Sequence, residues 1–415
     1  MMNPEILKLS PYCYPEQISS SHLSEDLNNA FSKEGFHITC YAPTPCRGID
    51  KETRKKYKKI RHETRADGSI DIYRFSLFAE GKNPVVRALR YVLCNMIQYR
   101  KGIRTKNTDI VYSGSTPPTQ GILCGKTAKK LSKKYGRKVP YIYSLQDVFP
   151  DSLVSSGLAS KGSLLWKIGR KIEDKTYGYA DRIIVISNDI KRNIMEKGVP
   201  EEKISVIPNW INVNEVRPVP RAENKLFDEL GIDRDRFIVV YAGNLGMAQG
   251  IDTFIEAAKK VSGVDFLIFG DGSSKEEYIE QSKGCGAIHF YPLLPRERVA
   301  EVYGMGSIAL VACKKGLGGG AVPSKTFSIM ASSTPVLLSF DRGTELWDLI
   351  ERENCGLCSE AGDADQLAEA IEYAAAHREE LSLMGQRARE CVEKRYSMEA
   401  GTSAYIRLFR EMSDH

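Results

Sequence analysis

Apolar residues occur along the chain in two patterns, short continuous runs and longer segments with helical spacing. The runs are typical of buried strands, and in the first half they lie at residues 6–9, 36–41, 70–75, 108–114, 139–145 and 181–186, the last strand expected there. A second series lies at 237–241, 264–269, 287–290, 307–311 and 336–338. Helical segments separate most of these runs, including 22–33, 251–261, 325–331 and 364–377. This alternation predicts parallel, doubly wound sheets.

The alternation restarts after a proline-containing stretch, 216–220, which predicts a boundary between two domains. A chain of 415 residues is also too long for a single core. We expect a first domain over 1–208, a second over 209–395, and a C-terminal helix in 396–415 that packs back on the first domain. The predicted fold class is α/β, with two Rossmann-like domains that face each other across a cleft.

Composition indicates a folded protein with reduced thiols. Hydrophobic residues make up 42% of the chain, and because no apolar run reaches about 18 residues, no membrane span is predicted. The first residues, MMNPEILKLSPYC, lack the basic and apolar regions of a signal peptide, which predicts a cytoplasmic protein. Ten cysteines without paired CxxC motifs indicate free thiols. The isolated motif Cys355–Cys358 leaves metal or redox use as the minor alternative.

Charge is distributed unevenly between the two halves. Residues 1–200 carry 35 Lys and Arg against 19 Asp and Glu, mainly through basic segments at 51–61, 87–104 and 126–138, whereas the remainder carries 24 against 34. Apolar residues recur at helical spacing among the arginines of 85–104, which is typical of an amphipathic helix on an anionic bilayer. A helix that buries its apolar side and leaves its basic side in water explains the same residues. Nucleic-acid binding is not expected, because interleaved aromatic platforms are missing.

The stretch Gly316–Glu345 is the strongest candidate for a ligand site. Its glycines at 318–320 allow backbone amides to approach a ligand closely, and a helix that begins at Lys325 would present free amides and a cation to an anion. Glu345 follows the next strand, at the carboxyl edge where open α/β sheets bind ligands. These features predict a phosphate site. The alternative is that the glycines only form a flexible turn.

Turns at other strand ends supply further candidates. Gly243–Gly246 follows the first strand of the second half, and Gly270 and Gly272 follow the next strand. In the first half Asp147 ends a strand, where it can contact a substrate or, alternatively, cap the following segment. The loop after the first strand places polar residues beside the expected cleft: Glu16, Gln17 and His22. That loop lacks a G-x-G-x-x-G motif, so a nicotinamide or flavin cofactor is not expected.

Five blocks in this order carry a resemblance to a known family: YAGNLGMAQGIDTFIEAA, FLIFGDGSS, LLPRERVAEVYGMGSIALVAC, VPSKTFSIMASSTPVLLS and CGLCSEAGD. They follow a first half with PEQ…HLSEDLNNAFSKEGFHITCYAP and SLQDVFPDS. With these blocks the chain resembles glycosyltransferase family 4 of the GT-B superfamily, and within it the bacterial fucosamine-transferase-like branch of O-antigen and capsule biosynthesis. The resemblance covers nearly the whole chain.

The resemblance implies a retaining glycosyltransferase that takes its sugar from a nucleotide donor, usually linked to UDP, without a metal or another cofactor. The donor would bind residues at the strand ends of the second half: Gly243, Asn244, Gly246, Gln249, Gly270, Gly272, Gly319, Gly320, Pro323, Ser324, Lys325, Thr326 and Glu345. Many members have Arg, Lys and Glu at the positions held here by Asn244, Gln249 and Ser328. Lys325 is therefore the expected catalytic cation at the leaving phosphate, and Glu345 the candidate for the ribose-binding carboxylate. Asp147 is the catalytic candidate of the first half.

For the acceptor, the resemblance implies that the first half binds a lipid-linked or polysaccharide molecule during synthesis of a bacterial cell-surface glycan. Glu16, Gln17 and His22 are the acceptor-side candidates. Since this half is strongly basic, we expect a polyprenyl-diphosphate-linked acceptor and a peripheral position at the inner face of the cell membrane. A sugar-nucleotide 2-epimerase of the same fold is the alternative enzyme, and a basic binding protein is the alternative without catalysis.

Overall fold

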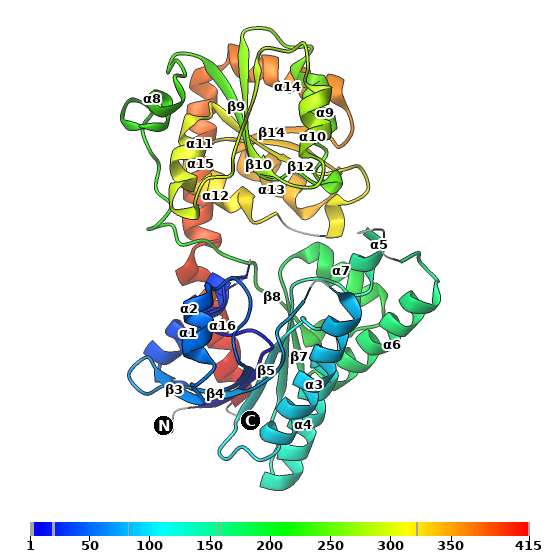
Figure 1. The fold of residues 1–415 in the computed structure, drawn as a ribbon. Helices are drawn as coiled ribbons and strands as arrows, with labels where there is room; N and C mark the ends of the chain where they lie inside the picture. The colour runs from blue at the N-terminus through cyan, green and yellow to red at the C-terminus, as the bar shows by residue number, and fades with distance from the viewer. Residues whose placement is uncertain are drawn as a thin grey trace. The chain divides into compact units, whose positions relative to one another are not determined.

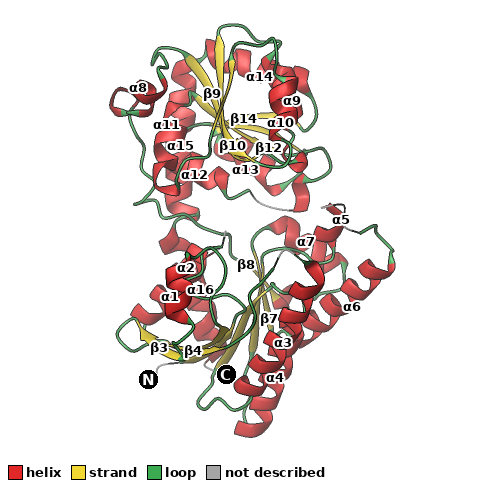
Figure 2. Cartoon of the chain, in the orientation of Figure 1, coloured by secondary structure: helices red, strands yellow, loops and turns green. Residues whose placement is uncertain are grey.

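The chain folds into two compact units, which a computed structural model describes over residues 4–18, 21–81, 83–155, 157, 159–320 and 323–413 (Figures 1 and 2). The first unit holds residues 1–208 together with 402–415, and the second holds residues 209–401. Each unit contains one largely parallel sheet covered by helices. The prediction of an α/β fold with two doubly wound domains is therefore confirmed.

Eight strands form the sheet of the first unit, in the order β3-β4-β2-β1-β5-β6-β7-β8. Their bounds are Glu5–Leu9 (β1), His37–Pro43 (β2), His62–Arg65 (β3), Ile70–Phe75 (β4), Ile110–Gly114 (β5), Tyr141–Leu145 (β6), Arg182–Val185 (β7) and Ile204–Val206 (β8). The sheet is parallel except that β3 pairs antiparallel with β4. Because β3 is a short edge strand with the polar sequence HETR, it gave no apolar signal. The prediction that 181–186 is the last strand is wrong, since the half-buried β8 follows β7 at the other edge.

Helices cover both faces of this sheet: α1 (Ser21–Lys33), α2 (Lys51–Tyr57), α3 (Pro84–Gly102), α4 (Gln120–Tyr135), α5 (Asp151–Ser155), α6 (Leu164–Tyr179), α7 (Asn188–Glu196) and α16 (Met398–Ser413). The last of these brings the end of the chain into the first unit. The buried ring of Phe409 lies 4.7 Å from that of Phe31 in α1 and 5.3 Å from that of Tyr112 in β5, measured between centroids. The two ends of the chain thus share one core.

Six parallel strands form the sheet of the second unit, in the order β11-β10-β9-β12-β13-β14. Their bounds are Phe237–Asn244 (β9), Val264–Asp271 (β10), Ile288–Tyr291 (β11), Ile308–Ala312 (β12), Val336–Phe340 (β13) and Gly356–Glu360 (β14). Counted from β9, this is the 3-2-1-4-5-6 order of a Rossmann sheet, whose direction of winding reverses between β9 and β12. The strand β14 was not predicted, because its sequence GLCSE is mostly half-buried at the edge.

Residues of the central strands alternate between two cores. Phe237, Val239 and Tyr241 pack on one face of the sheet, whereas Ile238 and Val240 pack on the other. The covering helices are α8 (Leu226–Leu230), α9 (Ile251–Ala258), α10 (Lys275–Gln281), α11 (Val299–Met305), α12 (Lys325–Ala331), α13 (Glu345–Glu353), α14 (Ala364–Ala376) and α15 (Arg378–Arg395). A sheet buried on both faces fixes its strand ends rigidly, which makes the edge at β9 and β12 a firm base for a site.

Candidate active site

The site of the second unit lies where β9 and β12 end side by side. β9 finishes in Gly243 and Asn244, and β12 finishes in Ala312. Gly243 has φ +149°, a conformation that favours glycine over any residue with a side chain. Ligands of open α/β sheets bind in the crevice at such a reversal point. The structure therefore places the predicted Gly243–Gly246 turn at the position where a ligand is expected.

Lys325, the first residue of α12, directs its ammonium to this strand end. The residue as a whole is half-buried, but its Nζ atom is sealed from solvent and has no hydrogen-bond partner among the described residues. Nζ lies 3.9 Å from the centroid of the Tyr241 ring, and a Cβ added at Gly243 would stand 2.7 Å from it. The glycine therefore makes room for the lysine. Burial lowers the pKa of the ammonium to about 7.

A buried cation without a partner is costly, so its presence at this edge points to an anion. The next residue, Thr326, is also buried, and its Oγ1 has no partner within the described part of the chain. Thr326 N donates to the carbonyl of Pro323 at 3.0 Å, whereas Ser324 is exposed and makes no side-chain cap for α12. Two buried polar atoms at the start of α12, Lys325 Nζ and Thr326 Oγ1, thus lack a partner within the described part of the chain, and a phosphate would satisfy the ammonium.

The loop before α12 is shaped by Asp341, which the sequence did not single out. Its carboxylate accepts hydrogen bonds from the amides of Gly316 at 2.9 Å and Gly318 at 2.8 Å. Gly319 and Gly320 complete a single 3-10 turn with Gly318, and residues 321 and 322 lie outside the described part of the predicted stretch. An Asp directly after a buried strand was the available signal, because β13 ends at Phe340.

Two predicted donor residues, Gly270 and Gly272, serve the packing of the β9 turn. A Cβ at Gly270 would stand 2.5 Å from the carbonyl oxygen of Gly243, and one at Gly272 would stand 2.5 Å from that of Leu245. Leu245 N donates to the carbonyl of Asp271 at 2.8 Å. The end of β10 therefore supports the turn through close backbone contact, and these glycines make that contact sterically feasible.

The rest of the turn is held from two sides. The hydroxyl of Tyr241 donates to the carbonyl of Asn244 at 2.7 Å, and the exposed Asn244 side chain folds towards Gly246. Beyond it, Lys314 N donates to the carbonyl of Ala248 at 2.9 Å, which joins this loop to the loop after β12. Gln249 follows as a half-buried residue at the end of a 3-10 turn. The structure thus brings the turn and the β12 loop together around one edge.

Glu345 begins α13, as the sequence predicts, just beyond the carboxyl end of β13. Thr344 caps this helix by accepting a hydrogen bond from Trp347 N at 3.4 Å. The Glu345 side chain is half-buried. Its position in the first turn places a carboxylate on the same sheet edge as Lys325, and its role toward a ribose stays a prediction.

In the first unit, Asp147 follows β6 at the carboxyl edge of the sheet. The preceding residue is held there, because Gln146 N donates to Ser115 Oγ at 3.3 Å. Asp147 is exposed, but the protein around it partly desolvates the carboxyl and raises its pKa above the ordinary value. An ionisable group at the carboxyl edge with a raised pKa is suited to accept a hydrogen bond or a proton from a hydroxyl.

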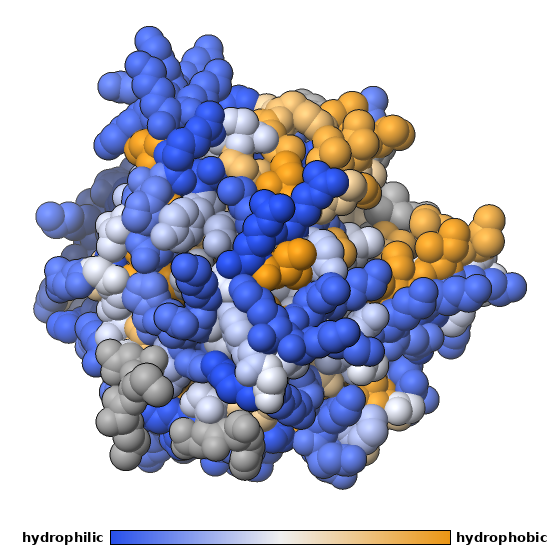
Figure 3. Space-filling model, turned by 90° about the horizontal axis from the view of Figure 1, so that it is seen from below, coloured by the Kyte–Doolittle hydropathy of each residue, from blue (hydrophilic) through white to orange (hydrophobic). Residues whose placement is uncertain are grey.

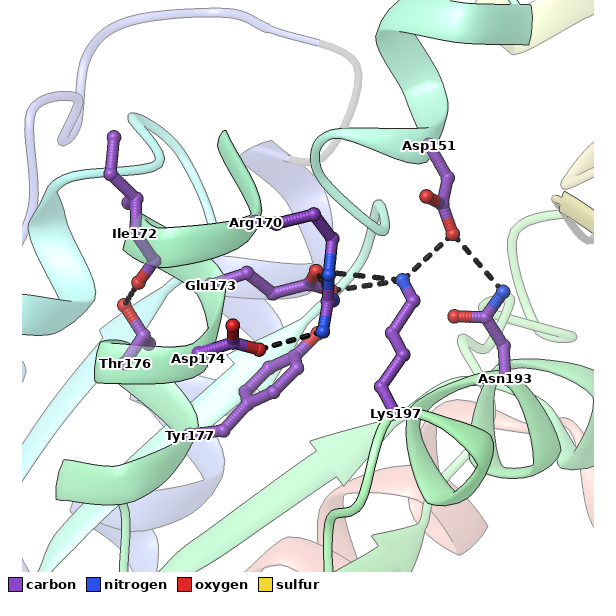
Figure 4. A network of polar contacts seen from close by, with 9 residues as sticks. All are labelled: Asp151, Arg170, Ile172, Glu173, Asp174, Thr176, Tyr177, Asn193 and Lys197. Carbon is purple, nitrogen blue, oxygen red and sulfur yellow. Dashed lines mark hydrogen bonds and ion pairs between the residues drawn. The ribbon is translucent and has the colours of Figure 1, made fainter. Parts of the chain in front are cut away.

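A network of charged side chains fixes the segment that follows Asp147 (Figure 4). Lys197 contacts Asp151 of α5 at 2.7 Å and the buried Glu173 of α6 at 3.1 Å. Asn193 of α7 donates to Asp151 at 3.1 Å, and the Tyr177 hydroxyl donates to Glu173 at 2.5 Å. Three helices are thereby joined at one point, and the network restricts movement of the β6–α5 connection.

Of the three acceptor-side candidates, Glu16 has a structural role, whereas Gln17 and His22 lie in or next to the loop after β1. Glu16 is buried, and its carboxylate accepts hydrogen bonds from the amides of Cys46 at 2.8 Å, Arg47 at 3.0 Å and Cys13 at 3.2 Å. It therefore ties the loop after β1 to the loop after β2, and burial raises its pKa. Gln17 is exposed, and His22 is half-buried in the first turn of α1. These two stay candidates.

The basic helix α3 shows its apolar side to solvent. Val85 is 74% exposed, Leu89 54% and Met96 46%, whereas Arg90 is fully buried. Arg90 donates from Nε to the carbonyl of Phe78 at 3.1 Å and from Nη2 to Cys46 Sγ at 3.3 Å. The expectation that the arginines of this helix form its solvated or membrane-facing side is therefore wrong for Arg90.

Exposed apolar residues also lie on α6, which packs on α4 as α3 does. Leu164 is 75% exposed there, and Leu165 and Ile168 are about half exposed. The space-filling view shows hydrophobic side chains gathered towards one side of the surface, bordered by hydrophilic ones (Figure 3). Within the described residues, no helix has the length and apolarity needed to cross a bilayer.

Comparisons with known proteins agree with this architecture. The family model described as Glycosyltransferase Family 4 matches residues 23–215, and the one described as Glycosyl transferases group 1 matches residues 222–391. The chain is 29% identical over 300 residues to the glycosyltransferase WbjE of Pseudomonas aeruginosa, which covers 71% of this chain and 72% of that protein. It is 27% identical over 261 residues to the colanic acid biosynthesis glycosyl transferase WcaI of Escherichia coli K12, covering 61% and 64%.

Solved structures show the same fold over nearly the whole chain. Sucrose-phosphate synthase from Thermosynechococcus elongatus superposes with a TM-score of 0.73 at 16% identity, covering 99% of both chains. HepE of Anabaena, solved in complex with UDP-glucose, superposes with a TM-score of 0.68 at 14% identity, covering 98% of this chain and 99% of HepE. The first match covers most of the first unit, the second lies in the second unit, and the two follow each other almost without a gap. The chain is therefore a family 4 glycosyltransferase of the GT-B fold.

Proposed function

We propose that this enzyme transfers a sugar from a UDP-linked donor to an acceptor hydroxyl, with retention at the anomeric carbon and without a metal ion. The observation that carries the proposal is the buried, unpartnered Nζ of Lys325 beside the glycine end of β9. A diphosphate at this strand edge would supply the missing anionic partner. The UDP-glucose bound by HepE, which has the same fold, supports the choice of UDP.

In the proposed reaction, the acceptor oxygen attacks the anomeric carbon from the same face as the leaving phosphate, which retains the configuration. Its bond to that carbon forms as the bond from the carbon to the β-phosphate oxygen breaks, and the hydroxyl proton passes to the leaving phosphate. Negative charge then grows on the leaving UDP, and Lys325 neutralises it from a fixed position in a water-poor site. An approaching diphosphate raises the pKa of Lys325 from about 7, so the lysine is protonated when the donor is bound. This fixed charge is the reason for proposing a reaction without a metal ion.

Asp147 is the proposed contact with the acceptor or the reacting sugar. Its carboxyl sits at the carboxyl edge of β6, and the raised pKa strengthens its affinity for a hydroxyl proton. The network of Lys197, Asp151 and Glu173 holds the adjoining helices. We therefore assign Asp147 a catalytic role and the network a positioning role.

We further propose that the acceptor is a polyprenyl-diphosphate-linked glycan of the cell surface, and that the enzyme is cytoplasmic and peripheral at the inner face of the membrane. The name of WcaI, a relative, assigns that protein to colanic acid biosynthesis. The exposed apolar residues of α3 and α6 lie in a half with a large excess of Lys and Arg. Apolar side chains that enter the bilayer interface and cations that attract anionic lipids act together.

A panel of UDP-sugars tests the donor assignment. We expect the true donor, and UDP itself, to raise the melting temperature of the wild-type protein, and activity to persist in EDTA once the donor and a lipid-linked acceptor are supplied. Release of UDP that depends on the acceptor would separate the transferase from a 2-epimerase. Failure of every uridine nucleotide to stabilise the protein, or loss of activity in EDTA that Mg²⁺ restores, would refute the corresponding part of the proposal.

A further inference from the structure

A cavity of about 290 Å³ lies at the carboxyl ends of β2 and β4, where the amide of its lining residue Cys46 donates to the carboxylate of Glu16 at 2.8 Å. These two strands are parallel neighbours, with Pro43 opposite Phe75. The chain continues from them through Thr44 and Ser76, and Thr44 N donates to the carbonyl of Phe75 at 2.8 Å. The cavity is lined by Thr44, Pro45, Cys46, Arg54, Lys58, Ser76, Leu77 and Ala79. It therefore opens at the sheet edge where α/β units bind ligands.

The two cations of the lining are the half-buried Arg54 of α2 and the exposed Lys58, which follows the last residue of that helix. Arg54 and Lys58 are four residues apart, which places their side chains on the same side of the helix. Asp50 caps the helix by accepting from Thr53 N at 2.8 Å, and the buried Tyr57 ring lies 4.9 Å from the Arg74 guanidinium of β4. Cap and ring hold α2 at a fixed orientation, so the two cations are held at the cavity.

Nothing acidic lines the cavity, and the side chains of Arg54 and Lys58 have no ion-pair or hydrogen-bond partner among the described residues. Nearby carboxylates are engaged elsewhere. Glu63 pairs with Arg74, and Glu80 accepts from the Tyr12 hydroxyl at 2.7 Å. A third cation stands behind the lining, because Arg61 donates to Ser76 Oγ at 2.7 Å. The Thr44 hydroxyl donates to the carbonyl of Phe75 at 3.3 Å, so the cavity combines unpaired positive charge with the hydroxyl of Ser76 as a donor.

We propose that this cavity is a phosphate subsite of the acceptor domain, which holds the diphosphate that links the acceptor sugar to its lipid. This inference rests on the proposed function, because it gives the acceptor a chemical class. Two cations match the charge of a diphosphate, and the Ser76 hydroxyl can donate to one of its oxygens. A recognised diphosphate also fixes the distance between the membrane and the sugar that reacts, since the diphosphate joins the lipid to the glycan.

Two double variants of α2 test the subsite, with inorganic pyrophosphate as the probe. Arg54→Gln with Lys58→Gln removes both lining charges, whereas Lys55→Gln with Lys56→Gln removes two exposed charges of the same helix that do not line the cavity. Titration calorimetry of the full chain is run with UDP present, so that the donor site is occupied. We expect the first pair to weaken pyrophosphate binding at least about tenfold, and the second pair to change it less than about twofold.

Equal losses in the two double variants, or no pyrophosphate binding to the wild type with UDP present, would overturn the subsite. Sedimentation with phosphatidylglycerol vesicles shows whether the phosphate that the cavity binds belongs to a lipid headgroup or to the acceptor. If the first pair of substitutions reduces vesicle binding more than the second pair does, the cavity binds a lipid headgroup. The assignment of the cavity to the acceptor diphosphate would then be wrong. Stabilisation by UDP is recorded for each variant, because its absence in the wild type refutes the donor proposal whether or not the cavity binds pyrophosphate.

Discussion

Lys325 is the residue on which the proposed chemistry depends most. Lys325→Ala should lower kcat at saturating donor by about 10²-fold or more, because one fixed charge at a leaving group contributes on that scale. The fold should persist, since the apolar contacts of α12 come from Phe327, Ile329 and Met330. Lys315→Ala, at an exposed position of the same loop, is the matched control and should keep its activity. Unchanged turnover in Lys325→Ala would contradict the phosphate role.

The same lysine should make stability depend on pH. Burial lowers its pKa from 10.5 to about 7, so between these values the unfolded chain binds a proton that the folded chain does not. The free energy of unfolding should therefore rise as pH increases from about 7, while below about pH 7 the folded state carries the full cost of the buried charge. Urea denaturation at about pH 7 and pH 9 measures this rise, which Lys325→Met should reduce. An identical rise in both proteins would show that other groups cause it.

Sequence reasoning located Lys325 and Gly243 because their chemistry is tied to residue type and to a strand end. It did not place Glu16 or Arg90, since a charged residue is expected at the surface. Both are buried because loops distant in sequence supply their partners, such as the amides of Cys46 and Arg47 for Glu16. Residue type alone does not indicate such partners.

At the scale of elements, α3 shows why a helical pattern leaves two interpretations open. The spacing of its apolar residues predicted the helix, but it did not indicate which side faces the protein. Its polar side is buried and donates hydrogen bonds to the protein: Asn95 donates to Thr119 Oγ1 at 2.7 Å, and Gln98 donates to the carbonyls of Ser10 and Tyr41 at 2.8 Å. The apolar side is therefore left on the surface.

This orientation predicts how the helix meets a membrane. Leu89→Gln with Met96→Gln should lower sedimentation with anionic vesicles severalfold at low salt, because both exposed side chains would enter the bilayer interface. Thermal stability should change little, since neither side chain belongs to the core. Leu293→Gln with Leu383→Gln removes two equally exposed apolar residues of the second unit and is the control. If the wild-type protein does not bind anionic vesicles at low salt, the proposed membrane association is refuted.

The network around Lys197 gives a prediction for three helices together. Lys197→Met leaves Asp151 and the buried Glu173 without this shared cation, and it should lower the free energy of unfolding by about 3 kcal/mol. Lys191→Met, in the same region, breaks a pair with the fully exposed Glu201 and should lower the free energy of unfolding much less. Chemical denaturation compares the two. Equal costs would mean that the network adds no more than a surface ion pair.

At the scale of the whole molecule, the sequence predicted two doubly wound α/β domains because strand and helix periodicities alternate throughout. It could not supply the strand order, which depends on pairings between segments distant along the chain. The sequence pattern did not predict the antiparallel β3 or the edge strands β8 and β14, and the physical reason is the same for all three. Edge strands are half-exposed and short, so they lack the continuous apolar run that marks a central strand.

The shared core of the two chain ends predicts a defect confined to one unit. Phe409 is fully buried against Phe31 and Tyr112, so Phe409→Ala should destabilise the first unit by about 3–5 kcal/mol. Arg410→Ala breaks only a pair with the half-exposed Glu34 and should cost less than about 1 kcal/mol. Hydrogen exchange read peptide by peptide should speed up across β1, β5 and α1 in Phe409→Ala, while β9 and β12 keep their protection and UDP still binds. Loss of protection in the second unit as well would contradict this prediction, because it would show that the C-terminal helix stabilises both units.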